Sequence, residues 1–255
     1  MCGRYGASWG VDDLVAEFEL DSVDVPVEER LEPDYNVAPT KPVYGIVTRR
    51  GRDEPAEAEP SRRLVTLQWG LVPSWAKDPR IGARMINARV ETVAEKQAFR
   101  SAFARRRCLL PADGYYEWYT PRAGVGQAGG KQPFYIRRRD GKTLAMAGLY
   151  EFWLDKSKDR DDPTAWLRTA TVITTTASDA IGEIHDRQPM FVEPSGWAAW
   201  LDPEETDAAA LTRLLVPSPG AGLEAYQVST AVNNHRNNGP DLIVPLAEAE
   251  PQTLF

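Results

Sequence analysis

Residues 108–119 read CLLPADGYYEWY and contain two short runs of strand-forming residues, Cys108–Pro111 and Tyr115–Tyr119. Aromatic and branched side chains of this kind favour extended backbone. Outward from this stretch, similar short runs recur along most of the chain. They are Val43–Thr48, Arg63–Trp69, Phe134–Arg138, Leu144–Trp153, Ala170–Thr175, Met190–Val192, Ala225–Val228 and Leu242–Pro245. So many short strands predict that a sheet forms the body of the fold.

Helical periodicity is confined to a few segments, at residues 11–20, 92–104, 178–184, 195–201 and 203–215. Polar loops at 50–61, 120–132 and 155–164 interrupt pairs of strands, so we interpret them as hairpin insertions and not as domain linkers. Strands and helices do not alternate strictly along the chain. We therefore predict an α+β fold, a single domain over residues 2–250 with a curved, mainly antiparallel, barrel-like sheet and peripheral helices.

The composition excludes several classes of protein. The chain has 255 residues, enough for one sizeable core, with two cysteines and two histidines. These make neither a disulfide framework nor a structural zinc site. The sequence contains no P-loop, no dinucleotide-binding glycine motif and no HExxH motif, so we expect no metal and no cofactor. No run suits a membrane span and the N-terminus lacks a signal-peptide core, so we expect a cytoplasmic protein.

Charge is unevenly distributed along the chain. The formal net charge is −7, which taken whole argues against nucleic-acid binding. Residues 11–34 carry ten acids and one base, whereas residues 62–107 carry eleven bases and three acids. A concentrated basic segment can bind a polyanion locally even in an acidic protein. A solvated helix face would give the same pattern, so charge alone leaves both interpretations open.

Cys2 is the clearest chemical signal, because it becomes the N-terminal residue once Met1 is removed, as expected before a small second residue. The mature chain would then carry an amine and a thiol on adjacent carbons, with reference pKa values of roughly 7.7–8.0 and about 8.5. Such a 1,2-aminothiol turns an aldehyde into an imine and then closes a thiazolidine ring. It can also be the nucleophile of an amidohydrolase. The plain alternative is that Met1 is retained.

Three further segments carry side chains suited to chemistry. Asn87 and Arg89 would share one face of a strand, where the amide can both donate and accept and the guanidinium suits phosphate. Glu117 lies between aromatic residues, and burial there would raise its pKa and suit it to proton transfer. His185 follows a predicted helix and titrates near neutral pH. Plain alternatives are a helix cap, a solvated guanidinium and an exposed carboxylate. We assign no catalytic role to His235.

Together these segments resemble the SRAP family, named for SOS response-associated peptidase. The resemblance covers nearly the whole chain. Its motifs, in order, are CGRY (2–5), YNVAPT (35–40), WGLVP (69–73), INARVET (86–92), CLLPADGYYEW (108–118), AGLYEFW (147–153), VITTTAS (172–178), IHDRQPM (184–190) and VSTAVNNHRNNGPDLIVP (228–245). Several motifs in one order make the match specific.

Members of this family recognise abasic sites in single-stranded DNA and crosslink to them through a mature N-terminal cysteine, forming a thiazolidine with the ring-opened sugar. The resemblance implies that Cys2 is the nucleophile and that Asn87 positions its amine and the lesion. It implies that Glu117 supports proton transfer and that His185 assists sugar ring opening and crosslink reversal. The DNA contacts it implies are Arg4, Trp75, Arg89 and Thr174.

Three interpretations follow. The first is a DNA-damage response protein that crosslinks to abasic sites, with associated lyase-like and self-processing peptidase activity. Its partner is single-stranded DNA, and we expect a monomer that joins the nucleoid when bound to damaged DNA. The second is an N-terminal-nucleophile cysteine peptidase or amidohydrolase. The third is a non-enzymatic nucleic-acid-binding module that retains Met1. The basic stretch at 62–107 favours DNA over an amide as the target.

Overall fold

The computed structural model of the chain describes residues 2–51, 54–55, 57–120, 131–177, 179–220 and 222–246. Its strands are β1 (Tyr5–Ala7), β2 (Ser22–Val23), β3 (Asp34–Val37), β4 (Pro42–Arg49), β5 (Ser61–Trp69), β6 (Asn87–Arg89), β7 (Arg107–Ala112), β8 (Gly114–Tyr119), β9 (Gln132–Arg138), β10 (Leu144–Leu154), β11 (Trp166–Thr176), β12 (Arg187–Pro189), β13 (Phe191–Val192), β14 (Leu215–Val216) and β15 (Leu223–Gln227). Its α-helices are α1 (Val11–Phe18), α2 (Arg100–Arg105), α3 (Asp179–Ile184), α4 (Trp197–Leu201) and α5 (Ala208–Arg213). Short 3-10 helices are η1 (Val27–Glu29), η2 (Pro79–Arg84), η3 (Pro163–Ala165), η4 (Pro194–Gly196), η5 (Thr230–Asn233) and η6 (Pro240–Ile243).

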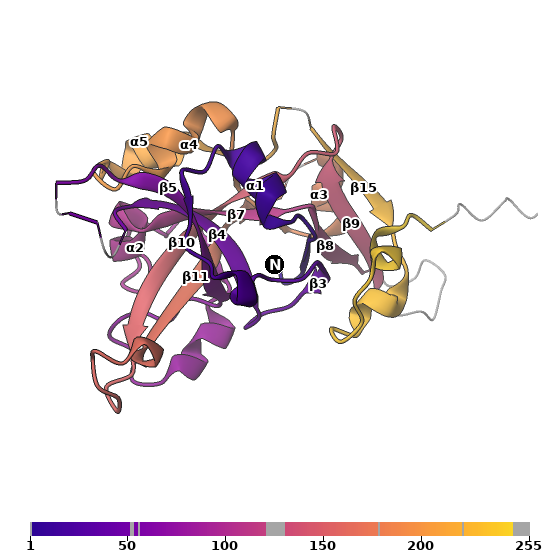
Figure 1. Cartoon of the computed structure of the whole chain (residues 1–255). Helices are drawn as coiled ribbons and strands as arrows, with labels where there is room; N and C mark the ends of the chain where they lie inside the picture. Colours follow the sequence, from indigo (N-terminus) through magenta and orange to yellow (C-terminus); the bar gives the residue numbers. More distant parts are fainter. Residues whose placement is uncertain are drawn as a thin grey trace, which may run out of the picture.

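The larger sheet closes into a barrel. Strands follow one another in the order β5, β4, β7, β10 and β11, and β11 returns to pair with β5 (Figure 1). Pairing is parallel between β11 and β5, between β11 and β6, and between β2 and β5, and antiparallel elsewhere in the described strands. The predicted α+β fold with a mainly antiparallel, barrel-like sheet is confirmed.

Alternate residues of the barrel strands fill its interior. We call this set the interior cluster; it comprises Val43, Val47, Val65, Leu67, Trp69, Cys108, Leu110, Leu144, Met146, Ala170 and Val172, and it continues into Cys2, Tyr5, Tyr115, Ile181 and Phe191 at one end. The interior is narrow. A Cβ atom on Gly45 would lie 2.5 Å from Leu67, and one on Gly148 would lie 2.9 Å from the Cys108 sulfur. A side chain at either position would therefore force its neighbours in the interior to move.

Residues between those of the interior cluster face outward and are covered by helices. Ile46, Leu109 and Leu149 pack in one cluster with residues of α1, α2 and α4. Phe18 of α1 stacks on Trp197 of α4 with ring centroids 4.6 Å apart. Figure 1 shows α4 and α5 together on one side of the barrel. The peripheral helices predicted from the sequence are thus confirmed, and burial of this outer face is what holds them.

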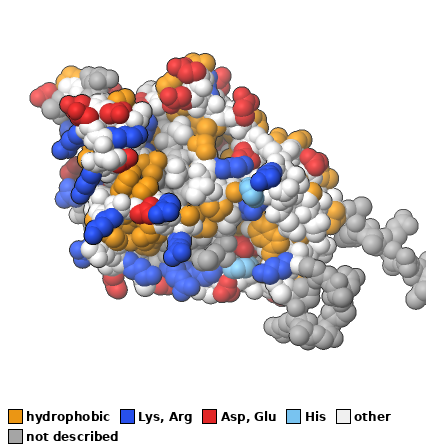
Figure 2. All heavy atoms as spheres, turned by 90° about the horizontal axis from the view of Figure 1, so that it is seen from below, with side chains coloured by type: hydrophobic (Ala, Val, Ile, Leu, Met, Phe, Trp, Pro, Cys, Tyr) orange, Lys and Arg blue, Asp and Glu red, His pale blue; other side chains and the backbone are white. Residues whose placement is uncertain are grey.

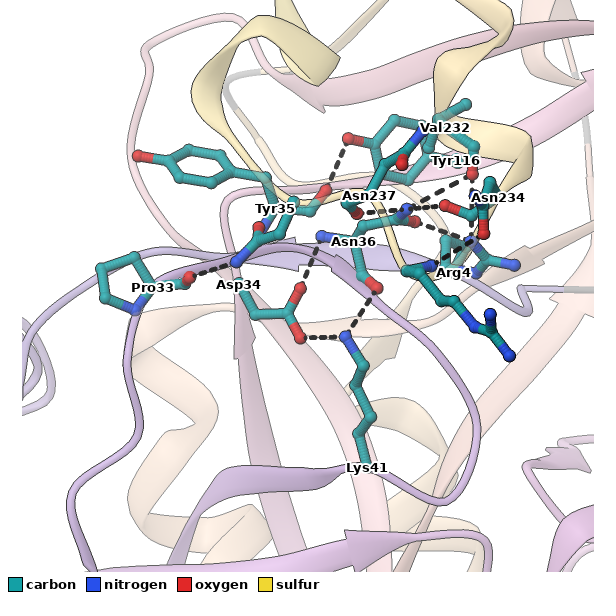
Figure 3. A network of polar contacts seen from close by, with 12 residues as sticks. Arg4, Pro33, Asp34, Tyr35, Asn36, Lys41, Tyr116, Val232, Asn234 and Asn237 are labelled. Carbon is teal, nitrogen blue, oxygen red and sulfur yellow. Dashed lines mark hydrogen bonds and ion pairs between the residues drawn. The ribbon is translucent and has the colours of Figure 1, made fainter.

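A smaller sheet, ordered β15, β9, β8, β1 and β3, brings the N-terminal segment to one end of the barrel. β1 pairs with β8, opposing Tyr5 to Tyr115. Asn36 of β3 is fully buried, and its Nδ2 lies 2.9–3.3 Å from the carbonyl oxygens of Val232, Asn234 and Asn237 (Figure 3). This single amide fastens the asparagine-rich C-terminal segment over the start of the chain.

Two local predictions were wrong. The helix expected at 92–104 is reduced to α2, because Val93 and Phe99 are both buried in the outer cluster. Six residues of unbroken helix would set those side chains about 120° apart around the helix axis, on different faces. The strand expected at Leu242–Pro245 gives way to η6, which Pro240 begins and whose Leu242 is buried. Proline suits the first position of a helix and lacks the N–H that a strand ladder needs.

The polar loops do connect paired strands. Residues 50–60 join β4 to β5 and residues 155–165 join β10 to β11, and both pairs are antiparallel. The third loop joins β8 to β9, which are also paired, although its residues 121–130 lie outside the described part of the chain. The interpretation of all three as hairpin insertions is therefore confirmed.

Candidate functional site

Cys2 lies at the end of the barrel where the smaller sheet meets it. The residue is fully buried and belongs to the interior cluster, three positions before β1 begins. Burial raises the pKa of its thiol well above the ordinary value, and the nearby Glu117 carboxyl adds to that rise. In this environment the sulfur is a thiol at neutral pH. Its use as a nucleophile therefore requires a group that favours the thiolate.

Asn87 contacts Cys2 directly. It opens β6, which lies parallel to β11 with Asn87 opposite Val172. Its Nδ2 donates a hydrogen bond of 2.7 Å to the Cys2 carbonyl oxygen. Its Oδ1 is buried and accepts no hydrogen bond from the described residues. One end of the amide thus holds the Cys2 backbone, while the other is a buried acceptor.

Glu117 lies on β8 and is almost fully buried, at 2% exposure. The expectation that it would be buried was correct, and the plain alternative of an exposed strand carboxylate is wrong. Burial raises its pKa from 4.5 to about 7. A carboxyl that titrates near neutral pH can donate and accept a proton under the same conditions, which is what general acid–base work needs.

His185 lies opposite Glu117. It directly follows α3, which packs against β8. Its Nε2 is 3.8 Å from Glu117 Oε2. Its Nδ1 lies 3.0 Å from the Arg187 backbone N–H, from which it accepts when unprotonated, and 3.3 Å from the Arg187 carbonyl oxygen, to which it donates when protonated. Burial lowers the pKa of His185 below 6.5, and the Asp186 carboxylate, 3.1 Å from Nδ1, opposes that shift.

Sequence reasoning missed the pair that supports this histidine. Arg187 of β12 is 7% exposed and binds Glu91 through both Nη atoms, at 2.7 and 3.1 Å. Its Nη2 also donates to the Thr174 carbonyl oxygen and, at 3.2 Å, to the Thr174 hydroxyl. The arginine therefore ties β12, beside His185, to β11 and to the end of β6. The IHDRQPM motif contains Arg187, but the partner Glu91 lies 96 residues away.

The residues predicted to contact DNA fall into two groups. Trp75 is 52% exposed, and Arg89 is exposed on the strand that carries Asn87. Figure 2 shows Lys and Arg side chains around the histidine side chains on one face of the molecule. Thr174 by contrast is 1% exposed and its hydroxyl accepts from Arg187, so it presents no surface to a strand in this structure. It supports Arg187 instead.

Arg4 serves the protein itself. Its Nη1 donates to Asn36 Oδ1 at 2.7 Å and to the Val232 carbonyl oxygen at 3.1 Å (Figure 3). The guanidinium lies over the Trp118 ring, 5.9 Å from its centre. Partial burial lowers the pKa of Arg4. Any DNA contact by Arg4 would therefore be shared with its role in fastening the C-terminal segment.

The basic stretch at 62–107 is not uniformly a binding surface. Arg63 and Arg107 are buried, and Arg107 donates to backbone carbonyls of Trp200 and Phe103, an internal structural role. Arg80 is exposed but is paired with Asp78. The exposed remainder consists of Lys77, Arg84, Arg89, Lys96, Arg100 and Arg105. The expected local positive charge is therefore present, but smaller than the sequence count.

Two further features bear on the chemistry. Across the described ranges, no group of three or more His, Cys, Asp or Glu side chains could hold a metal ion. In the same part of the chain, no helix has the length and apolar character needed to cross a bilayer.

Comparison with known proteins shows the family of the chain. The family model described as SOS response associated peptidase (SRAP) matches residues 1–235. Abasic site processing protein YoqW of Bacillus subtilis (strain 168) is 38% identical over 245 residues, covering 95% of this chain and 99% of its own. Abasic site processing protein YedK of Escherichia coli (strain K12) is 30% identical over 252 residues, covering 96% and 100%.

A solved structure, from Bacteroides thetaiotaomicron, shares the fold with a TM-score of 0.77 over 96% of this chain and 100% of that one, at 24% identity. The family match spans most of the chain, and the relatives align over almost their full length. The chain belongs to the SOS response associated peptidase (SRAP) family.

Proposed function

We propose that this protein responds to abasic sites in single-stranded DNA and crosslinks to them through Cys2 after removal of Met1. The names of its relatives, abasic site processing proteins, support the target. The observation that carries the proposal is the convergence of four segments on one buried point. Asn87 holds the Cys2 carbonyl at 2.7 Å, and His185 faces Glu117 at 3.8 Å beside it.

The first step is release of the aldehyde. An abasic sugar is mostly a closed hemiacetal, so its ring oxygen must gain a proton and its anomeric hydroxyl must lose one. Burial lowers the pKa of His185 below 6.5, so its ring is mainly neutral at neutral pH, and burial raises the pKa of Glu117 to about 7. One group can donate while the other accepts. We therefore assign the two proton transfers of ring opening to His185 and Glu117.

The second step joins protein and DNA. The α-amine of Cys2 attacks the aldehyde carbon, and loss of one water leaves an imine. The sulfur then adds to the imine carbon, the nitrogen takes up the proton, and a five-membered thiazolidine closes without any redox change. The buried Oδ1 of Asn87 suits the amine as an acceptor. We therefore assign Asn87 to positioning the amine.

Lyase-like activity follows from the same imine. Removal of a proton from the carbon next to the imine carbon expels the 3′ phosphate and cleaves the strand. Ring closure by sulfur consumes the imine before elimination, so the thiazolidine protects the site. In a protein that lacks the Cys2 thiol, we expect a larger fraction of the imine to end in cleavage of the DNA strand.

An amide is the competing electrophile, and self-processing at Met1 would be one instance. The buried thiol with a carboxyl and an imidazole nearby is the observation that favours it. The exposed Trp75 and Arg89 suit an unpaired strand better than a peptide, because aromatic faces stack on bases and guanidinium binds phosphate. We propose that the protein acts on damaged DNA, and that it does so in the cytoplasm as a monomer.

The test begins with the intact mass of the purified protein, which must lack Met1. The protein is incubated with single-stranded DNA carrying one abasic site and analysed by denaturing electrophoresis and mass spectrometry. We expect an adduct whose mass is the sum of both partners less one water. Cys2→Ala should abolish it, whereas Cys108→Ala, the loss of the other buried cysteine, should not. A full adduct from Cys2→Ala would refute the proposal.

A further inference from the structure

Tyr115 carries a buried hydroxyl that the described chain leaves without a hydrogen-bond partner. The side chain is fully buried on β8. Its neighbour Tyr116 donates to the Tyr35 carbonyl oxygen at 2.7 Å, but the Tyr115 hydroxyl makes no such bond. An unpaired buried hydroxyl is costly, and it is free to donate to a neighbouring atom that becomes charged in another state.

The strand directs this hydroxyl toward the site. Residues two apart on a strand point to the same face, so Tyr115 and Glu117 share a face of β8, and Tyr116 takes the other. Tyr116 packs outward with Tyr135 and Val228, whereas Tyr115 packs in the interior cluster together with Cys2. Burial raises the pKa of Tyr115, and the nearby Cys2 and Glu117 add to the rise through their negative charges, so the hydroxyl keeps its proton at neutral pH.

We propose that the Tyr115 hydroxyl donates a hydrogen bond to the Cys2 sulfur when that atom is a thiolate. The assignment rests on the proposed function, in which the Cys2 sulfur adds to the imine carbon; a thiolate adds faster than a thiol. It explains how a thiol that burial disfavours as an anion reaches its reactive form. A hydrogen bond to a charged atom is among the stronger ones in a protein, and it exists only in the ionised state.

Other groups also act on this sulfur, and the test must separate them. The titratable groups around it are Glu117 on β8, Tyr5 on β1, His185 after α3 and the α-amine of the mature chain. None of these is altered by Tyr115→Phe. That substitution removes one oxygen atom and hardly changes the side-chain volume. Because the lost hydroxyl has no hydrogen-bond partner, its removal leaves no other group unpaired and should not lower thermal stability.

The experiment is an ultraviolet titration of the Cys2 thiolate in the mature protein, taken as the difference from Cys2→Ser. We expect Tyr115→Phe to move the thiolate midpoint upward by about one pH unit, and to slow crosslinking about tenfold below the midpoint. The matched control is Tyr135→Phe, which removes another fully buried, unpartnered hydroxyl from the opposite face. It should leave the midpoint unchanged.

An unchanged midpoint in folded Tyr115→Phe would overturn the inference, and so would an equal shift in Tyr135→Phe. The titration needs no DNA. If the wild type formed no adduct while the midpoint still moved, the proposed function would fail and the hydrogen bond would stand. If Tyr115→Phe were misfolded by circular dichroism, Tyr115→Met in the same titration would replace it, with the same upward shift expected.

Discussion

At the scale of single residues, burial acts on two acids of the site with different consequences. It holds the Cys2 sulfur in its protonated form, and it brings the Glu117 carboxyl to a pKa of about 7. The carboxyl gains the ability to exchange protons at neutral pH, whereas the thiol needs help to ionise. In the proposed mechanism the same buried surroundings therefore suit Glu117 to proton transfer and call for a neighbour that stabilises the Cys2 thiolate.

Replacing Glu117 should stabilise the fold. Its folded pKa, about 7, lies above the ordinary 4.5, so its contribution is fully present below pH 4.5 and is lost as the pH rises through 7. Glu117→Gln is neutral throughout. We expect equal stability at pH 4 and a gain of about 3 kcal/mol at pH 8, measured by urea unfolding, while crosslinking is lost. A variant less stable at pH 8 would contradict the burial argument.

Asn87 offers a second prediction at this scale. Asn87→Ala leaves the Cys2 carbonyl without its donor and the amine without its acceptor. A stranded buried group costs roughly 1–3 kcal/mol, so we expect crosslinking to slow roughly ten- to a hundredfold. The matched control is Asn233→Ala, an exposed amide bound to Trp118. Equal single-turnover rates in both variants would remove Asn87 from the positioning role.

At the scale of elements, the site depends on a frame built by β6, β11 and β12. Arg187 binds Glu91 beyond β6 and Thr174 on β11, and its backbone N–H holds His185. Asn87 opens the same short β6 strand. A shift of this arginine would therefore move the imidazole and the amide together.

Glu91→Gln tests that frame. The carboxylate is half-exposed, so its loss should cost only about 1 kcal/mol of stability. The Arg187 hydrogen bond lowers the pKa of Glu91, so this contribution is present above pH 4.5 and disappears as the pH falls through the lowered value. We expect crosslinking and reversal to slow several-fold together, with a shifted histidine limb in the pH–rate profile. Glu95→Gln, exposed on the same segment, should match wild type.

Much of this arrangement could be predicted from the sequence, and the exceptions have physical causes. Short aromatic and branched runs identified the barrel strands, and motif order identified the family. The break before α2 could not be predicted, because it follows from burying Val93 and Phe99 in one cluster. The contact between the buried Thr174 and Arg187 could not be predicted either, because Arg187 is held by an acid 96 residues away. Local pattern carries no information about such partners.

At the scale of the whole molecule, an acidic protein presents a local basic surface. The net charge of −7 repels DNA at long range, and salt shortens the reach of that repulsion. Close contacts by Arg89 and its exposed neighbours act oppositely, because each neutralised phosphate releases counterions. The affinity for DNA should therefore depend only modestly on salt. A few exposed arginines and lysines set this dependence, and not all eleven bases of residues 62–107.

The last prediction concerns that salt dependence, measured by fluorescence anisotropy on single-stranded DNA with the Cys2→Ala protein, which we expect not to crosslink. Arg89→Ala should reduce the slope of log affinity against log salt by about 0.7, the value for one phosphate contact on a single strand. Trp75→Ala should weaken binding by roughly 1–3 kcal/mol at every salt concentration and leave the slope unchanged, because stacking releases no counterions.

The matched control for Arg89 is Arg80→Ala, since Arg80 is equally exposed but already neutralised by Asp78. Its removal should leave both affinity and slope near wild type. If Arg80→Ala and Arg89→Ala reduced the slope of log affinity against log salt equally, the basic surface would attract DNA only through its overall charge. The idea that the DNA strand passes over Arg89, beside Asn87, would then be wrong. If only Arg89→Ala lowered it, a phosphate would lie within reach of β6, next to the residue that holds Cys2.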